Sequence, residues 1–140
     1  MNRIVFPEKA AFSMQLDIRI SDINYGMHMA NDAVARFVNE ARVGYLRKLG
    51  YEDELHIEGV SLIMRDSYTQ FRSEGFYGNE IVIEVYTEVL SDREFLLFYK
   101  LLHKESEKAL AYCRTSMLCF DYSIRKPVSI PEEFRKKLEG

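Results

Sequence analysis

The chain has 140 residues, of which 47% are hydrophobic and 29% charged, a size and composition typical of one globular domain over residues 1–140. Its formal net charge of -3 provides no general attraction to nucleic-acid phosphates, so we expect no nucleic-acid partner. No apolar stretch reaches the roughly 18 residues of a membrane span, and the first residues lack a secretory signal. We therefore expect a cytoplasmic protein that does not enter a membrane, with Cys113 and Cys119 as reduced core residues.

The first predicted strand is followed by a loop of unusual composition. Residues 11–20 alternate apolar and polar side chains, which is the period of a half-buried strand. Residues 21–32, SDINYGMHMAND, are rich in Ser, Asp, Asn and Gly, as loops are, yet they also contain tyrosine, histidine and two methionines. A loop with these side chains is a candidate functional site.

A single long helix is predicted next. Apolar side chains recur every three or four residues from Ala30 to Leu49, which is the period of an amphipathic helix. Asn31 or Asp32 is expected to cap its N-terminus, and Gly50 to end it. At 1.5 Å per residue the helix would be roughly 28 Å long.

Four further strands are predicted at 60–72, 79–90, 93–104 and 108–121, and a short terminal helix begins at Pro131. The short breaks between the strands predict hairpins and an antiparallel sheet. The apolar stripe of the long helix must be buried, and the sheet is its only large partner. We therefore predict an α+β fold in which a five-stranded antiparallel sheet wraps around one long central helix. Its unpaired edge strands favour a symmetric dimer.

This order of elements resembles the hotdog fold, and the sequence is similar to thioesterases of the 4-hydroxybenzoyl-CoA thioesterase group. Three segments carry the resemblance: residues 19–32, residues 39–42 with Leu46 and Gly50, and residues 74–79. The resemblance implies an acyl-CoA or acyl carrier thioester as substrate and a homodimer or dimer of dimers. No metal spacing, phosphate loop or dinucleotide motif is present in the sequence, so we expect no metal and no cofactor.

Thioester hydrolysis needs a polarised carbonyl group, a positioned water molecule and a proton acceptor. We expect free backbone N–H groups of residues 27–31, at the start of the helix, to hold the oxyanion, and Gly26 to let the backbone come close. Many relatives have an aspartate where this chain has Asn24, which cannot act as a base. The base must then be sought among His28, Asp32 and Glu40, with Asn24 orienting the substrate or the water.

Each candidate also has an interpretation without catalysis. Asp32 suits the first turn of a helix, Glu40 suits an ion pair with Arg36 or a dimer interface, and a lone loop histidine such as His28 is often structural. Asp22 is expected to anchor the loop through backbone hydrogen bonds. The predicted substrate-binding residues come from the loop and from aromatic positions beside the strands: Tyr25, Gly26, Met27, Met29, Asn31, Tyr68, Phe76 and Tyr77.

The sequence thus predicts a thioester hydrolase in which Asn24, His28, Asp32 and Glu40 are the catalytic candidates. Two alternatives stay open. A hotdog module can hold an acyl carrier without turnover, because a fold does not dictate function, and a hotdog dehydratase or hydratase is the third possibility. The acyl chain and the choice between CoA and acyl carrier protein are not fixed by the sequence.

Overall fold

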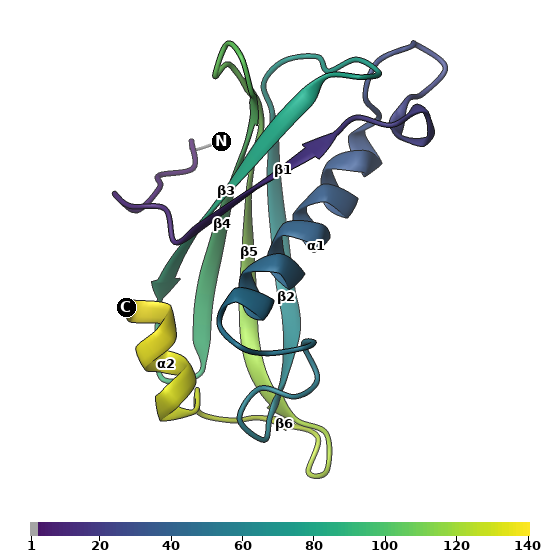
Figure 1. The fold of residues 1–140 in the computed structure, drawn as a ribbon. Coiled ribbons are helices and arrows are strands. Elements are labelled where there is room, and N and C mark those ends of the chain that lie inside the picture. The colour runs from purple at the N-terminus through teal and green to yellow at the C-terminus, as the bar shows by residue number, and fades with distance from the viewer. Residues whose placement is uncertain (1–2) are drawn as a thin grey trace.

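The computed structural model describes residues 3–140, which form a curved sheet with one long helix on its inner face (Figure 1). The predicted long strands and both helices are confirmed, with small differences at their ends. The described residues also contain a short sixth strand and a 3-10 turn. The elements in chain order are β1 (Phe12–Asp17), η1 (Ile20–Asp22), α1 (Asn31–Lys48), β2 (Ser61–Phe71), β3 (Glu80–Val89), β4 (Glu94–His103), β5 (Ala109–Asp121), β6 (Lys126–Pro127) and α2 (Glu132–Glu139).

The sheet is antiparallel throughout, and its long strands lie in the order β1-β3-β4-β5-β2, with β6 beside the end of β5. The strands β3, β4 and β5 follow one another through hairpins, as predicted. The break between β2 and β3 was expected to be a hairpin too, and that prediction is wrong. β2 pairs with β5 at one edge while β3 pairs with β1, so residues 72–79 carry the chain from one side of the sheet to the other.

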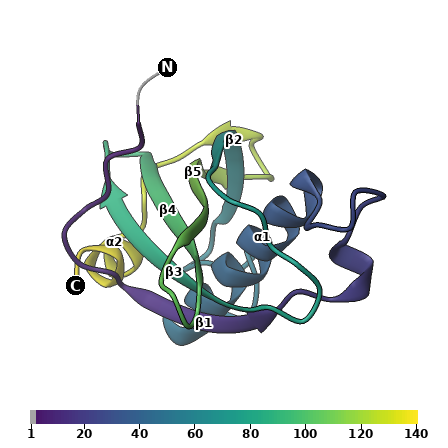
Figure 2. The same cartoon turned by 90° about the horizontal axis from the view of Figure 1, so that it is seen from above.

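The concave face of the sheet holds the main core, because α1 lies against it (Figure 2). The apolar stripe predicted for the helix is buried there, and Glu40 lies on the solvent side. Strand residues at every second position meet this stripe, as the period of a strand requires. The central members of this core are Val34, Phe37, Val38, Ala41, Tyr45, Ile81, Ile83, Val85, Leu97, Tyr99 and Leu101.

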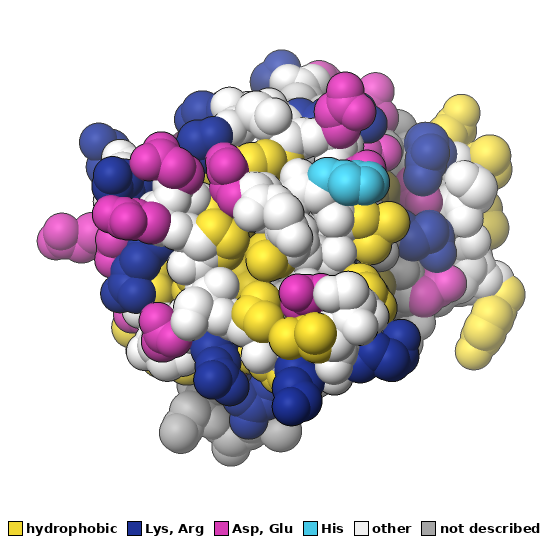
Figure 3. Space-filling model, turned by 90° about the horizontal axis from the view of Figure 1, so that it is seen from below, with side chains coloured by type: hydrophobic (Ala, Val, Ile, Leu, Met, Phe, Trp, Pro, Cys, Tyr) yellow, Lys and Arg dark blue, Asp and Glu magenta, His cyan; other side chains and the backbone are white. Residues whose placement is uncertain are grey.

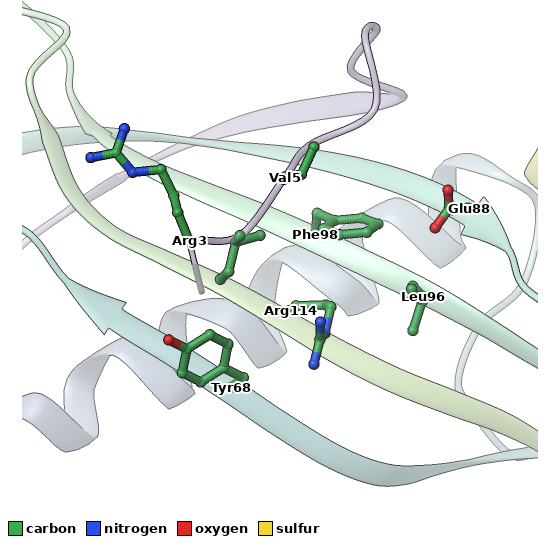
Figure 4. Close-up of a pocket in the computed structure, with 8 residues that line it drawn as sticks. Arg3, Val5, Tyr68, Glu88, Leu96, Phe98 and Arg114 are labelled. Carbon is green, nitrogen blue, oxygen red and sulfur yellow. The ribbon is translucent and has the colours of Figure 1, made fainter. Parts of the chain in front are cut away.

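The convex face is covered by the N-terminal segment, residues 3–9, which we call the strap (Figure 4). Phe6 of the strap packs against Tyr86, Phe98 and Tyr112, with ring centroids 5.3, 5.8 and 5.1 Å away. Edge-on contacts at such distances are favourable beyond the apolar area that they bury. The strap therefore closes a second, smaller core on the side of the sheet that α1 does not reach.

The C-terminus of α1 was predicted correctly, but the residue that caps its N-terminus was not. Ala30, rather than Asn31 or Asp32, occupies the N-cap position, and no side chain caps the first turn. The expected side-chain cap is therefore wrong, because the Asp32 carboxylate is bound to Arg36 instead. At the other end Gly50 has a φ of 101°, the left-handed conformation that ends many helices, as predicted.

The remaining structural predictions concern membrane-spanning helices, the two cysteines and the location of the protein. No helix among residues 3–140 is long and apolar enough to cross a membrane. Cys113 and Cys119 are both buried and unbonded to each other, as expected, and burial raises the pKa of the Cys119 thiol to about 12. At the end that carries α2, hydrophobic side chains reach the surface between side chains of both charges (Figure 3). The cytoplasmic location stays a prediction.

Candidate active site

A cleft of about 800 Å³ lies where the loop before α1 faces the end of β2. It is bounded on one side by residues 24–25 and 28–32 and on the other by residues 71–74. Both walls meet at a backbone hydrogen bond of 2.7 Å, in which the N–H of Met29 donates to the carbonyl of Gly75. The loop singled out by its composition therefore does line a cleft, and the helix N-terminus opens into the same space.

Asn24, Gly26 and His28 form a compact group on the loop wall. The Asn24 Oδ1 accepts a hydrogen bond of 2.9 Å from the Gly26 N–H. A Cβ on Gly26 would lie only 3.1 Å from His28 Nε2 and 3.2 Å from Asn24 Oδ1, so glycine is what allows both side chains to approach. The His28 Nδ1 lies 3.3 Å from the Met29 carbonyl, which can only accept. In the neutral ring this leaves Nε2 as an acceptor.

The backbone amides of the loop are less available than the sequence predicted. The N–H groups of Met27, Met29 and Ala30 donate to the carbonyls of Asn24, Gly75 and Asp22. These three therefore cannot hold an oxyanion without breaking a bond, and the prediction for residues 27–31 is wrong at those positions. Within residues 3–140, the N–H groups of His28, Asn31 and Asp32 have no acceptor. The last two are free because they start α1 and lack a preceding turn.

Asp32 belongs to a chain of charged groups. Its carboxylate accepts a bond of 3.0 Å from Arg36 Nη1, and Arg36 Nη2 reaches Asp22 at 3.2 Å. Asp22 is fully buried and also accepts from the Arg19 backbone N–H at 2.8 Å, so it anchors the loop as predicted. Burial acts to raise the pKa of Asp22, but the backbone and side-chain hydrogen bonds from Arg19 and the bond from Arg36 outweigh it. The pKa of Asp22 is lowered as a result.

Glu40 does not join this group. It lies two turns further along α1, on the exposed side, and does not line the cleft. The ion pair expected between Glu40 and Arg36 is absent from the described residues, since Arg36 binds Asp22 and Asp32 instead. Of the two helix carboxylates, only Asp32 lies in the cleft.

The predicted substrate-binding residues fall into three places. Tyr25, Met29 and Asn31 line the cleft, whereas Gly26 and Met27 lie beside it on the loop. Phe76 and Tyr77 are exposed in the link between β2 and β3, outside the lining.

Tyr68 lies on the convex face, in a separate cleft of about 540 Å³ beneath the strap, with Arg114 and Phe98 (Figure 4). Its register explains this position, because Tyr68 pairs with Arg114 and therefore points away from α1. The structure thus does not bring it to the loop.

Several residues of the cleft were not predicted. Arg72, Ser73 and Glu74 form the wall opposite the loop, next to the exposed ring of Phe71. The Arg72 guanidinium lies 5.4 Å from the centre of the Tyr112 ring, which holds it at the edge of the cleft. Three features of the sequence indicated this wall: the end of the predicted strand 60–72, the aromatic Phe71 as a possible groove residue, and the matched segment 74–79, which begins with Glu74.

Solved structures with a similar fold include the following three. One is Slr0204, a 1,4-dihydroxy-2-naphthoyl-CoA thioesterase from Synechocystis, with a TM-score of 0.80 and 16% identity over 91% of this chain and 94% of that one. Another is the hypothetical protein SAV2348 from Staphylococcus aureus in complex with CoA, with a TM-score of 0.84 and 15% identity over 99% of this chain and 86% of that one. A third is the 12:0-ACP thioesterase from Umbellularia californica, with a TM-score of 0.80 and 15% identity over 91% of this chain and 49% of that one.

At such identities these likenesses establish the hotdog fold that the order of elements predicted. A comparison with curated proteins gives no match. A family model described as the Thioesterase-like superfamily matches residues 18–138, which include the whole loop, α1 and the sheet from β2 onward. The protein therefore belongs to the thioesterase-like superfamily, as its resemblance to hotdog thioesterases indicated.

Proposed function

We propose that the protein hydrolyses an acyl-CoA or a related acyl carrier thioester to a free acid and a thiol. The single observation that carries this proposal is the meeting, in one cleft, of two free helix N–H groups with the exposed carboxylate of Asp32. Helix N-termini carry partial positive charge, which favours a developing oxyanion. Membership of the thioesterase-like superfamily supports the same reaction.

In the proposed reaction, the thioester carbonyl oxygen binds the N–H groups of Asn31 and Asp32. A water molecule is oriented by His28 Nε2 and by the Asn24 amide, and its oxygen attacks the carbonyl carbon while its proton passes to the Asp32 carboxylate. The tetrahedral intermediate then collapses, the carbon–sulfur bond breaks, and the proton held by Asp32 passes to the leaving thiolate. The products are a carboxylic acid and a free thiol.

The proposal also includes a second copy of the chain. β2 is an edge strand of the sheet, eleven residues long, and its outer side has no partner strand among residues 3–140. An exposed edge of this length favours pairing with another copy. Phe71, at the end of this strand and in the cleft lining, is 59% exposed, so a partner along β2 would also narrow the cleft.

Thiol release from a panel of thioesters tests the proposed function. The purified protein is incubated with short, long and aromatic acyl-CoAs and with acyl carrier protein thioesters, and free thiol is followed with a chromogenic disulfide. We expect turnover with at least one class, loss of turnover in Asp32→Asn, and normal turnover in the matched helix variant Glu40→Gln. Tight binding of acyl-CoA without thiol release would instead support a non-catalytic module. Size-exclusion chromatography with light scattering tests the dimer.

A further inference from the structure

Arg36 binds two carboxylates that come from different parts of the chain. Its Nη1 donates to Asp32 at 3.0 Å, one turn earlier on α1, and its Nη2 donates to Asp22 at 3.2 Å, in the 3-10 turn before the loop. The hydrogen bonds to Asp22 and Asp32 raise the pKa of Arg36, so the guanidinium stays charged. A planar, two-armed cation suits this geometry better than a lysine would.

The two carboxylates differ in mobility. Asp22 is fully buried and fixed by the Arg19 backbone N–H, whereas the Asp32 side chain is 72% exposed. An exposed aspartate with no capping bond samples several rotamers, and holding one of them costs entropy. Because Arg36 is hydrogen-bonded to the fixed Asp22 carboxylate, it can hold the exposed Asp32 carboxylate in a defined position. The arrangement joins the anchor of the loop to the carboxylate in the cleft.

We propose that Arg36 is a positioning residue, which uses the buried Asp22 anchor to hold the Asp32 carboxylate in one orientation at the cleft. This inference rests on the proposed function only for its effect on turnover, since the geometry exists whether or not the protein hydrolyses thioesters. The Asp32 carboxylate, linked through Arg36 to Asp22, is then oriented before substrate binds.

Other charged or titratable groups lie near the same space. Arg19 and the buried Asp22 lie at the 3-10 turn, and His28, Arg72 and Glu74 line the cleft. None of these contacts the Asp32 carboxylate within ion-pair distance among the described residues, so Arg36 is its direct cationic partner. Removing Arg36 should therefore leave the carboxylate without a cation to fix its orientation.

The test compares Arg36→Met and Arg36→Lys with the matched control Arg47→Met, an exposed arginine in the last turn of the same helix. kcat and KM are measured for each variant, and the χ1 rotamer of Asp32 is followed by NMR three-bond couplings in ¹³C-aspartate-labelled protein, with Asp32→Asn assigning the signals. In Arg36→Met we expect kcat to fall roughly tenfold with little change in KM, and the Asp32 couplings to show averaging over several rotamers. Arg36→Lys should restore only part of kcat and part of the single-rotamer couplings.

A role confined to stability would lower the melting temperature of Arg36→Met without lowering kcat per folded molecule or changing the Asp32 couplings. That result, or an equal change in Arg47→Met, would overturn the inference. If Arg36→Met does not fold, the kcat and the Asp32 couplings of Arg36→Lys still decide it. Absence of thiol release by the unaltered protein would reject the proposed function alone, because the Asp32 couplings are read without substrate.

Discussion

Both faces of the sheet are covered, but only α1, on the concave face, brings a carboxylate and free N–H groups to a cleft. On the concave side α1 presents an exposed carboxylate and free N–H groups at its start, beside a loop of hydrogen-bonding side chains. On the convex side the strap presents Ile4 and Phe6, which pack on aromatic rings. Both sides have a cleft, of about 800 and 540 Å³.

This difference shows that a cleft lined by a cation does not by itself make a candidate active site. The convex cleft contains Arg3, Arg114 and Glu88, yet Arg114 lies over the Tyr68 ring and no helix terminus lines this cleft among the described residues. The concave cleft combines the exposed Asp32 carboxylate, the His28 ring and three backbone N–H groups, of His28, Asn31 and Asp32, that have no acceptor among the described residues. Four changes test whether this contrast holds.

The largest expected effect is on turnover. Asp32→Asn removes the proposed proton acceptor while keeping the size of the side chain, and we predict a loss of kcat of about 100-fold or more, the usual contribution of a general base. Glu88→Gln removes the carboxylate of the convex cleft and should leave kcat unchanged. Steady-state thiol release from the best substrate measures both. Equal losses of kcat in the two variants would contradict the placement of the reaction in the concave cleft alone.

The next effect is on stability. Phe6→Ala removes the ring that joins the strap to three aromatic side chains of the convex face. Because Phe6 is only partly buried, we predict a loss of about 2 kcal/mol in the free energy of unfolding, below the range for a fully buried ring. Urea denaturation measures it. Activity per folded molecule should stay the same, and a large drop in kcat would show that the two faces are coupled.

A smaller, pH-dependent effect is expected at Asp22. Its pKa is lowered in the folded protein, so its charge stabilises the fold above the unfolded value of about 3.9 and this contribution disappears as the pH falls through the folded pKa. We predict that Asp22→Asn lowers the free energy of unfolding by about 1 kcal/mol at pH 7. The gap between the two proteins should narrow steadily in urea titrations as the pH is lowered below about 3.9. A gap that persists unchanged in acid would contradict an ionised Asp22.

The smallest effect is predicted for Tyr68, which the sequence assigned to substrate binding. Because its ring lies under the strap on the convex face, Tyr68→Phe should leave KM for acyl-CoA within about twofold, the scatter expected for a change outside the site. The cleft-lining variant Phe71→Ala provides the comparison and should raise KM more. If KM rose to the same extent in Tyr68→Phe and Phe71→Ala, the substrate would have to contact both faces of the sheet.

Much of the fold was readable from local patterns, because the period of the strands and of α1 depends only on which side of each element is buried. The crossover after β2 was not, since nothing in residues 72–79 indicates that β2 pairs with β5 rather than with β3, the next strand in the chain. The prediction that residues 1–140 form one domain stays a prediction.

The sequence located the candidate site but did not predict which of its amides and carboxylates are available in the cleft. The composition of residues 21–32 identified the loop, and Asp22 was correctly assigned as an anchor. Which amides are free depends on acceptors such as the Gly75 carbonyl, far along the chain. The choice between Asp32 and Glu40 likewise depended on where the cleft lies, and helical spacing alone offered Arg36 to both carboxylates.

The bond between the Met29 N–H and the Gly75 carbonyl joins the two walls of the cleft through the main chain. A Cβ on Gly75 would lie 2.6 Å from Ile18 Cδ1, so a larger residue at this junction would disturb the core. Replacing side chains elsewhere in the lining would leave this main-chain junction in place. A change of aperture would instead require inserting or deleting residues in the 72–79 crossover, which makes that segment the natural place to engineer substrate size.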